Sequence, residues 1–227
     1  MNQSNIIKFE PSEARKALNL LYRGDDVVEL RIPKTTRGTV SGYFNDMEKL
    51  IVAAAEYSGE VPGIYITLNP VNPQLLARAN NRLERYANWT TSDADILCRR
   101  WLAIDVDAVR PAGISSTEEE HKLAITRSVQ IRDYLREQLG WALPILGDSG
   151  NGGHLLYRID LPNDSESRDL IKRCLDALDF LYSDEKVKVD VSVVNAARVW
   201  KLYGTLSCKG DNIQERPHRI ARIMEVE

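Results

Sequence analysis

Short runs of β-branched, aromatic and other apolar residues recur along the chain, and Gly, Pro or Asn bound them. Runs of this length and composition are typical of β-strands, and patterns with a helical period lie between them. The runs predict strands at residues 27–32, 63–68, 100–107, 142–146, 154–159, 187–194 and 218–225.

The most regular helical pattern lies at residues 118–139. Thr117 and Glu120 have the spacing of a capping box, in which each side chain bonds to the backbone of the other residue. Gly140 follows the last periodic position and is typical of a helix end. The residues that share the predicted buried face are Ala124, Ser128, Ile131, Leu135 and Leu139.

Three further segments carry helical patterns. Residues 165–182 place apolar side chains on one face, and Asn45 with Glu48 predicts the start of a helix near residues 46–58. In the third segment, basic residues recur at i, i+4 and i+7 and are interpreted as one face of a helix that leads into two aromatic side chains. These residues are Arg78, Arg82, Arg85, Tyr86 and Trp89.

The order of elements predicts the fold class. From residue 100 onward the order is strand, helix, strand, strand, helix, strand, which is the split βαβ layout of ferredoxin-like or RRM-like domains. We therefore predict an α+β protein of two lobes that share a cleft. An N-terminal α/β lobe would span residues 1–97, and an RRM-like palm would span residues 98–227. A palm of this kind occurs in polymerases and cyclases, but the fold alone does not give the function.

Composition excludes several classes of protein. The chain has 227 residues, of which 43% are hydrophobic and 28% charged, and no apolar run approaches the ~18 residues of a membrane span. The N-terminal segment lacks the pattern of a secretion signal, so a cytoplasmic location and no membrane partner are expected. The cysteines Cys98, Cys174 and Cys208 have no Cys-x-x-Cys spacing, which predicts reduced thiols, mostly in the core, and no zinc site.

The net charge of −3 does not by itself favour nucleic acid, but the positive charge is uneven. Basic residues gather in three stretches, at residues 31–37, 78–85 and 195–222. For each stretch alone a solvated surface is the better interpretation. Taken together they are candidate contacts for a nucleic-acid backbone, with a base stacking on Tyr86 or Trp89. The candidates are Arg37, Arg78, Arg82, Arg85 and Lys209.

The first candidate for chemistry is an Asp-x-Asp pair at the end of a predicted apolar strand. Side chains alternate along a strand, so Asp105 and Asp107 would lie on one face, about 7 Å apart. Carboxylates this close repel each other, and a bound cation relieves the repulsion. Two surface acids at a strand end are the alternative interpretation.

The second candidate is a glycine-rich segment at residues 147–154. Its glycines allow backbone N–H groups to approach an anion, and Ser149 and His154 are hydrogen-bond donors for phosphate oxygens. Asn151 and Gly152 lie in the same segment. It is not a Walker A or Rossmann motif, because a strand follows it. A tight hairpin loop is the alternative interpretation.

The third candidate lies near the C-terminal end of the chain. Asp190 ends an apolar strand, and a helical turn over residues 195–201 would place Asn195, Arg198 and Lys201 on one face. Such donors suit a polyphosphate. A structural Asp190 with surface cations explains the pattern as well. The combination is more specific than its parts, because strand-end acids, a Ser/His loop and paired cations are what in-line phosphoryl transfer with two metals requires.

The same residues resemble the archaeo-eukaryotic primase (AEP) superfamily. Its signature is an hhhDhD strand, then a small-x-His motif, then a strand that ends in hydrophobic-Asp. The corresponding segments here are residues 102–107, 152–154 and 189–190, in that order, with room for one helix in each interval. The resemblance covers roughly residues 60–222 and is strongest to the phage and plasmid primase-polymerase (PrimPol) branch. There a TLNP phrase precedes the first motif, and Asn-x-x-Arg-x-x-Lys-Leu-Tyr-Gly-Thr follows the last.

This resemblance implies a two-metal polymerase that makes or extends primers on single-stranded DNA during replication of a phage, plasmid or other mobile element. Asp105, Asp107 and Asp190 would hold Mg²⁺ or Mn²⁺ and act as the catalytic residues. Ser149 and His154 would hold the phosphates of incoming dNTPs or NTPs. Arg198 and Lys201 would grip the triphosphate.

Two departures from the family pattern stand out. No Cys or His cluster provides the zinc site that many relatives carry. The chain also ends soon after residue 225, whereas many relatives continue into a helical accessory domain and a helicase, which would be its partners. It is interpreted as a stand-alone catalytic core or as part of a longer protein, and unaided primer initiation is in doubt.

Other functions stay open at this point. They are a repair or CRISPR-associated gap-filling polymerase of the same superfamily, a metal-dependent nuclease or nucleotidyl cyclase, and a non-catalytic nucleic-acid-binding module.

Overall fold

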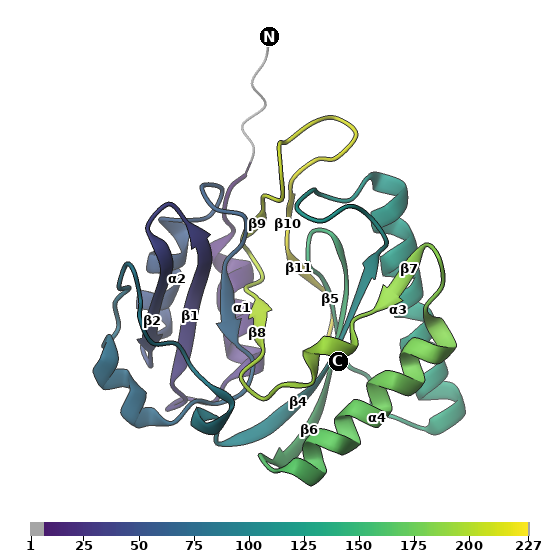
Figure 1. The fold of residues 1–227 in the computed structure, drawn as a ribbon, viewed down its shortest axis with the longest axis horizontal. Helices are drawn as coiled ribbons and strands as arrows, with labels where there is room; N and C mark the ends of the chain where they lie inside the picture. Colours follow the sequence, from purple (N-terminus) through teal and green to yellow (C-terminus); the bar gives the residue numbers. More distant parts are fainter. Residues whose placement is uncertain (1–6, 227) are drawn as a thin grey trace.

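The computed structural model describes residues 7–226. Residues 1–6, part of the segment in which we expect no secretion signal, lie outside the described residues, as does residue 227. The chain forms two halves that lie side by side, each built on an antiparallel sheet (Figure 1). This is the two-lobed α+β architecture that the order of elements predicts.

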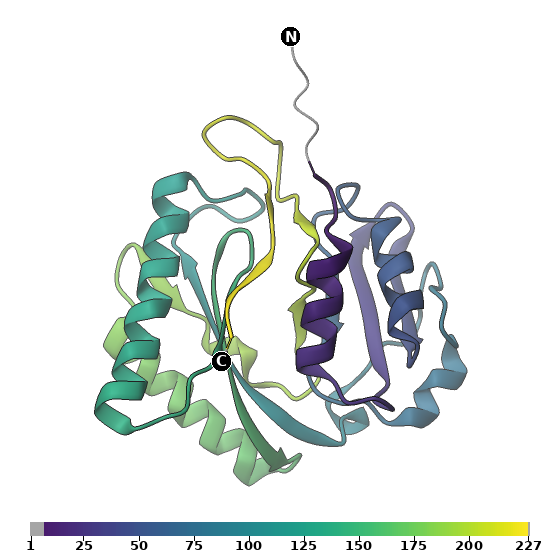
Figure 2. The ribbon, with the colours of Figure 1, turned by 180° about the vertical axis from the view of Figure 1, so that it is seen from behind.

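The first sheet has the strand order β2-β1-β3-β8. Its strands are β1 (Val28–Thr35), β2 (Gly38–Phe44), β3 (Tyr65–Thr67) and β8 (Val199–Lys201). Helices α1 (Pro11–Leu21) and α2 (Met47–Ala55) lie together on one face of this sheet, as the view from behind shows (Figure 2). Three short 3₁₀ helices, Pro73–Arg78, Asp93–Asp95 and Val191–Val194, lie in the connections.

The second sheet has the order β11-β5-β6-β4-β7, with every neighbouring pair antiparallel. Its strands are β4 (Cys98–Ala108), β5 (Ile145–Asp148), β6 (Gly152–Pro162), β7 (Val187–Val189) and β11 (Arg222–Glu225). Helices α3 (Glu118–Leu139) and α4 (Ser165–Tyr182) pack against it (Figure 1). The chain order β4-α3-β5-β6-α4-β7, with β4 between β6 and β7, is the split βαβ layout.

Local signals determine the ends of both palm helices. The Thr117 hydroxyl accepts a bond from the Glu120 backbone N–H at 3.1 Å, and the Glu120 carboxylate accepts one from the Thr117 N–H at 2.9 Å. Gly140 ends α3 in the left-handed region at φ 70°. Asp164 caps α4 by accepting from the Ser167 N–H at 2.8 Å. The predicted bounds of α3 and α4 are therefore confirmed.

β8 follows the palm strands in sequence but belongs to the first sheet. The chain leaves the palm after β7, and β8 then pairs antiparallel with β3, with Lys201 opposite Tyr65. The C-terminal part of the chain thus completes the N-terminal sheet. The division into residues 1–97 and 98–227 stays a prediction, and the pairing places residues 199–201 with the first sheet.

Two predicted helical faces are wrong. Residues 79–88 form turns and isolated bridges, because Ser41 on β2 exchanges backbone hydrogen bonds with Glu84 and holds this segment along the sheet edge. Arg78, Arg82 and Arg85 therefore do not share a helix. Residues 199–201 are a strand, so the helical turn proposed for Asn195, Arg198 and Lys201 does not form.

Smaller differences have local causes. The predicted strand 187–194 ends at residue 189, because the Asp190 side chain accepts from the Ser192 N–H and starts a 3₁₀ turn. α2 begins after Asp46 rather than Asn45, since the Asp46 carboxylate accepts from the Lys49 N–H. The predicted strand 218–225 divides into β10 (Arg219–Ile220), which pairs with β9 (Leu206–Ser207), and β11. No strand was predicted at β2, β8 or β9 and no helix at α1.

One hydrophobic cluster runs through both halves and joins them. An ion pair lies between the halves: Arg100 on β4 donates to Asp26, which precedes β1, and their side chains are 5% and 11% exposed. In residues 7–226 no helix is long and apolar enough to cross a membrane. The three cysteines are free and half-buried.

Candidate active site

A polar cavity of about 260 Å³ lies where the palm faces β3 and β8. Its lining comes from β4, the β5–β6 hairpin and the segment after β7 on one side, and from β3, β8 and the segment around β9 on the other. The lining residues are Tyr65, Asp105, Asp107, Ser149, Asn151, His154, Asp190, Arg198, Val199, Trp200, Lys201, Ser207 and Lys209. Most of the residues predicted to carry chemistry thus border one cavity.

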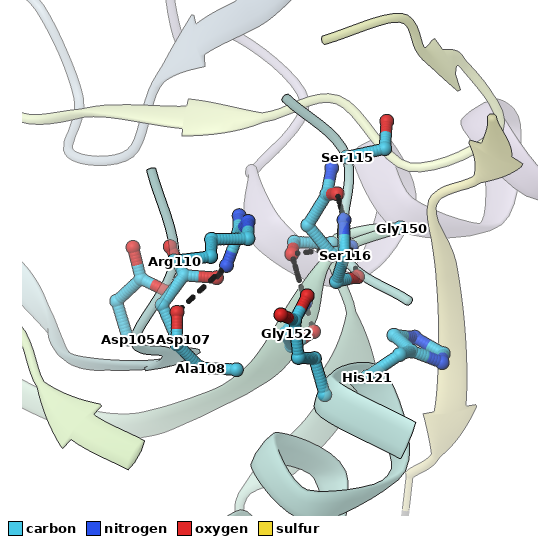
Figure 3. Close-up of polar contacts among 12 residues, drawn as sticks. Asp105, Asp107, Ala108, Arg110, Ser115, Ser116, His121, Gly150 and Gly152 are labelled. Atoms are coloured by element: carbon cyan, nitrogen blue, oxygen red, sulfur yellow. Dashed lines mark hydrogen bonds and ion pairs between the residues drawn. The ribbon is translucent and has the colours of Figure 1, made fainter. Parts of the chain in front are cut away.

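Strand pairing brings the three predicted acids together. Asp105 and Asp107 are two positions apart on β4 and therefore face the same side, as Figure 3 shows. Asp190 directly follows β7, which pairs with the end of β4, and its backbone N–H donates to the Asp105 carbonyl at 2.8 Å. The antiparallel pairing brings the third acid beside the first two.

Each acid faces a different basic side chain. The carboxylate of Asp105 lies 3.5 Å from His154 Nε2, that of Asp107 lies 3.4 Å from Arg110, and that of Asp190 lies 3.0 Å from Arg198. Arg110 turns back over Asp107 and the Ala108 carbonyl (Figure 3). As a result, no group of three or more Asp, Glu, His or Cys side chains in the described chain is gathered as a ready metal cluster.

The electrostatics of the acids nonetheless favour a cation. Burial, with the nearby carboxylates of Asp107 and Asp190, raises the pKa of Asp105 to about 8. A divalent ion would relieve this repulsion, and the ligands on offer are carboxylate oxygens, which Mg²⁺ and Mn²⁺ prefer. The three acids fit such ions if Arg110 and Arg198 give way to them.

A chain of hydrogen bonds holds the ring of His154 in place. The Trp200 indole N–H donates to the Tyr203 hydroxyl at 3.2 Å, and that hydroxyl lies 3.0 Å from His154 Nδ1. Nε2 of the same ring faces Asp105 at 3.5 Å. Burial and nearby cations lower the pKa of His154 to about 3, so the ring is neutral. In the tautomer that accepts the Tyr203 proton at Nδ1, Nε2 carries the ring proton and is a neutral hydrogen-bond donor toward the cavity.

Two glycines allow this arrangement. A Cβ on Gly147 would meet the Tyr203 hydroxyl at 2.4 Å, and a Cβ on Gly152 would meet the Val106 carbonyl at 2.3 Å and the Asp107 carboxylate at 2.6 Å. Gly147 makes room for the tyrosine that orients His154. Gly152 lets the hairpin approach β4 closely enough to place His154 opposite Asp105.

The glycine-rich segment is a hairpin between β5 and β6, the simpler of its two interpretations. The Ser149 hydroxyl accepts from the Gly152 N–H at 2.9 Å and donates to the Gly152 carbonyl, so it closes the turn. Asn151 is buried, and its side-chain oxygen accepts from the Ser116 N–H at 2.8 Å. Both residues line the cavity, but these atoms already have partners within the protein.

The predicted cations are placed differently from one another. Arg198 and Lys201 line the cavity, whereas Asn195 does not and instead ends the 3₁₀ turn after Asp190. Lys201 is 5% exposed, and its Nζ donates to the Leu206 carbonyl at 3.1 Å. Burial lowers the pKa of Lys201 to about 7.

A second cavity, of about 560 Å³, adjoins the first. The two share Tyr65, Asp107, Val199 and Lys209. The walls of the larger cavity are mostly apolar or backbone, with three cations at its rim. Among its lining residues are Pro33, Lys34, Pro62, Gly63, Arg110, Pro111 and Ile114.

The structure separates the basic residues predicted to contact nucleic acid. Lys209 borders both central cavities, and Arg37 and Arg85 line a third cavity of about 390 Å³ that also includes Lys34. Arg78 instead donates to the Tyr43 hydroxyl, and Arg82 pairs with Glu84. In the C-terminal stretch, three arginines form ion pairs with glutamates: Arg216 with Glu120, Arg219 with Glu118, and Arg222 with Glu10.

Sequence reasoning missed several residues in and around the cavity. Tyr65 and Trp200 line it and Tyr203 contacts His154, but these contacts depend on β8 pairing with β3. Arg110 follows the Asp-x-Asp pair by three residues, and that spacing is the one signal available in the sequence.

Asn69, in the TLNP phrase, is buried and joins separate segments, since its side chain accepts from the Arg100 N–H and donates to the Ala196 carbonyl.

Comparison with solved structures gives a fold relative. The AEP domain of the primase-polymerase (PrimPol) of cyanophage S-2L matches with a TM-score of 0.56 and 14% sequence identity, covering 96% of this chain and 91% of that chain. No protein-family model matches the sequence, and no curated protein matches it significantly. The chain therefore has the same fold as that domain.

Proposed function

We propose that this chain is a DNA primase-polymerase, which joins nucleotides on a single-stranded DNA template by two-metal nucleotidyl transfer. One observation carries the proposal: three carboxylates at strand ends line a single cavity together with the side chains of His154, Arg198 and Lys201. The likeness of the fold to the cyanophage AEP domain supports it. Replication of a phage, plasmid or other mobile element is the setting that we propose.

The three acids would hold the metals. In this proposal Asp105, Asp107 and Asp190 bind Mg²⁺ or Mn²⁺, which when bound activate the attacking 3′-hydroxyl and neutralise the charge on the triphosphate. Arg110 and Arg198, which now face two of these acids, become free to bind substrate phosphates. His154 takes the tautomer with the ring proton on Nε2 and donates from it to a phosphate oxygen.

The two adjoining cavities would divide the nucleotide between them. Ligand sites commonly measure roughly 300–1,000 Å³, and the polar cavity alone is near the lower end of that range. It suits the triphosphate and the metals. The larger neighbouring cavity, with its proline and isoleucine walls, suits a base and sugar.

Single-stranded DNA would pass the third cavity, where Lys34, Arg37 and Arg85 form no ion pair in the described chain. We expect Arg37→Glu/Arg85→Glu to weaken binding of a labelled single-stranded oligonucleotide by about tenfold or more. Each lost phosphate contact also lowers the slope of log affinity against log salt by about 0.7. Fluorescence anisotropy between about 50 and 200 mM salt measures both quantities.

Arg136→Glu/Arg173→Glu is the matched control for charge, because both arginines are exposed on the palm helices α3 and α4 and form no ion pair in the described chain. It should bind the oligonucleotide almost as the wild type does. An Arg37→Glu/Arg85→Glu variant that keeps the wild-type salt slope would remove the third cavity from the proposed DNA path.

The proposed function is tested by nucleotide incorporation on a single-stranded DNA template, with and without a primer, in Mg²⁺ or Mn²⁺. We expect primer extension that follows the template sequence and stops when a chelator removes the metal. Products made without a primer would make the protein a primase as well. Shortening of the DNA would instead favour a metal-dependent nuclease, and DNA binding with no product would favour a binding module.

A further inference from the structure

Lys201 is the most buried cation of the polar cavity and has no acidic partner in the described chain. Arg198 pairs with Asp190, whereas Lys201 and the half-buried Lys209 form no ion pair within residues 7–226. The Lys201 side chain is 5% exposed and lines the cavity. Of three possible hydrogen bonds from its Nζ, the structure provides one, to the Leu206 carbonyl.

The surroundings of Lys201 disfavour its charged ammonium form when no ligand is bound. The Tyr65 ring on β3 lies 5.8 Å from Nζ, Cys208 and Lys209 approach from the segment after β9, and the remaining cavity groups are the three acids, His154 and Arg198. A buried lysine without a counter-ion loses solvation, and the single hydrogen bond to the Leu206 carbonyl replaces only part of it. Burial first, and then Lys209, lower its pKa, so amine and ammonium forms coexist near neutral pH.

We propose that Lys201 is the proton donor to the pyrophosphate that leaves during nucleotide incorporation. This inference rests on the proposed function and assigns a role within it. A triphosphate that enters the cavity brings negative charge beside Nζ and favours the ammonium form. The unused N–H groups then face the substrate rather than the protein.

The step balances as follows. The 3′-oxygen of the primer forms a bond to the α-phosphorus, and its proton leaves to solvent. The bond from the α-phosphorus to the bridging oxygen breaks, and its electron pair stays on the pyrophosphate. One Nζ proton transfers to that oxygen, and the resulting amine takes a proton from water after pyrophosphate leaves.

The other cations of the cavity are less suited to this role. Arg198 keeps its proton at any physiological pH, so it contributes charge but does not donate a proton. Lys209 is only half-buried, so water solvates its ammonium. General acid catalysis typically contributes about 10²–10⁴-fold to a rate, which makes the assignment measurable.

The test compares wild type with Lys201→Arg and Lys201→Met in single-turnover incorporation. The substrates are dNTPs whose β,γ-bridging oxygen is replaced by CH₂, CHF or CF₂, which make progressively better leaving groups. Lys201→Arg keeps the positive charge but does not donate, and Lys201→Met keeps the length while removing a buried charge, so it should fold. Thermal unfolding verifies that both variants fold.

We expect both variants to react about 10²–10⁴-fold more slowly than wild type with natural dNTPs. We also expect their rates to rise more steeply with leaving-group quality, because the proton no longer assists departure. Nucleotide affinity should fall in Lys201→Met and be largely kept in Lys201→Arg. A folded Lys201→Arg with the wild-type rate, or equal slopes in all three proteins, would overturn the assignment. A wild type that incorporates no nucleotide would overturn the proposed function itself.

Discussion

Asp105→Asn is expected to lower the rate of nucleotide incorporation by about 10³-fold or more while the chain stays folded. In the proposed site, removal of one carboxylate weakens the binding of metals that stabilise the transition-state charge by several kcal/mol. Each tenfold change in rate corresponds to about 1.36 kcal/mol of activation free energy. Asn keeps the shape of the side chain but not its charge. Single-turnover primer extension in Mg²⁺ and Mn²⁺ measures the loss.

The same substitution should stabilise the metal-free protein. Burial and its acidic neighbours raise the pKa of Asp105 to about 8, from an ordinary value of 3.8 in the unfolded chain. The folded state therefore binds the proton more tightly, and the stability present at low pH is lost as pH rises toward 8. Asn has no such dependence. In EDTA, the melting temperature of Asp105→Asn should exceed that of wild type by more at pH 8 than at pH 5.

Asp160→Asn is the matched control. Asp160 lies on β6, outside the cavity, and its backbone has φ 48°, a conformation that Asn also tolerates. It should leave nucleotide incorporation unchanged. Wild-type activity in folded Asp105→Asn would remove Asp105 from the proposed metal site.

Glu29→Ala is expected to lower the free energy of unfolding by about 3–5 kcal/mol. Glu29 is 0% exposed, and its carboxylate accepts two bonds from Arg31, one from the Ser41 hydroxyl and one from the Thr91 N–H. Burial alone raises the pKa of Glu29, but these donors outweigh it and lower the pKa below its ordinary value. Alanine leaves the largely buried Arg31 guanidinium without its anion.

Denaturation in urea at pH 7 measures this loss, and Glu60→Ala is the control. Glu60 forms a surface ion pair with Lys8, both side chains being more than half exposed, so its removal should change the free energy of unfolding little. Glu29 accepts from the Thr91 N–H and Arg31 donates to the Thr91 carbonyl, so the two residues join β1 to the segment that carries Trp89. A loss in Glu29→Ala as small as in Glu60→Ala would mean that water replaces the buried carboxylate.

Several elements follow from local sequence. α3 and α4 begin and end where their capping residues predict, since the caps are satisfied by neighbours within a few residues. β4 and β6 are long runs whose burial matches their apolar pattern. Local pattern also led to one wrong prediction. The spacing of Arg78, Arg82 and Arg85 fits a helix, but backbone hydrogen bonds from the distant strand β2 hold that segment in turns.

Which basic residues form ion pairs could not be predicted from the sequence pattern. Arg216, Arg219 and Arg222 look alike in sequence as unpaired positive charge, yet each pairs with a glutamate. Arg37, Arg85 and Lys209 form no ion pair in the described chain. Charge pairing is decided by side chains far away along the chain, so composition could not separate the two groups.

By itself, the sequence determined the strand and helix order of the palm and the shared face of Asp105 and Asp107, because strand alternation and helix capping act over a few residues. It also indicated that Asp190 belongs with them, through the order of motifs. Only the tertiary structure decided that β8 returns to the first sheet, that Tyr203 contacts and orients the His154 ring, and that Lys201 is buried without an ion-pair partner. Each of these depends on contacts between segments whose distance along the chain carries no local signal.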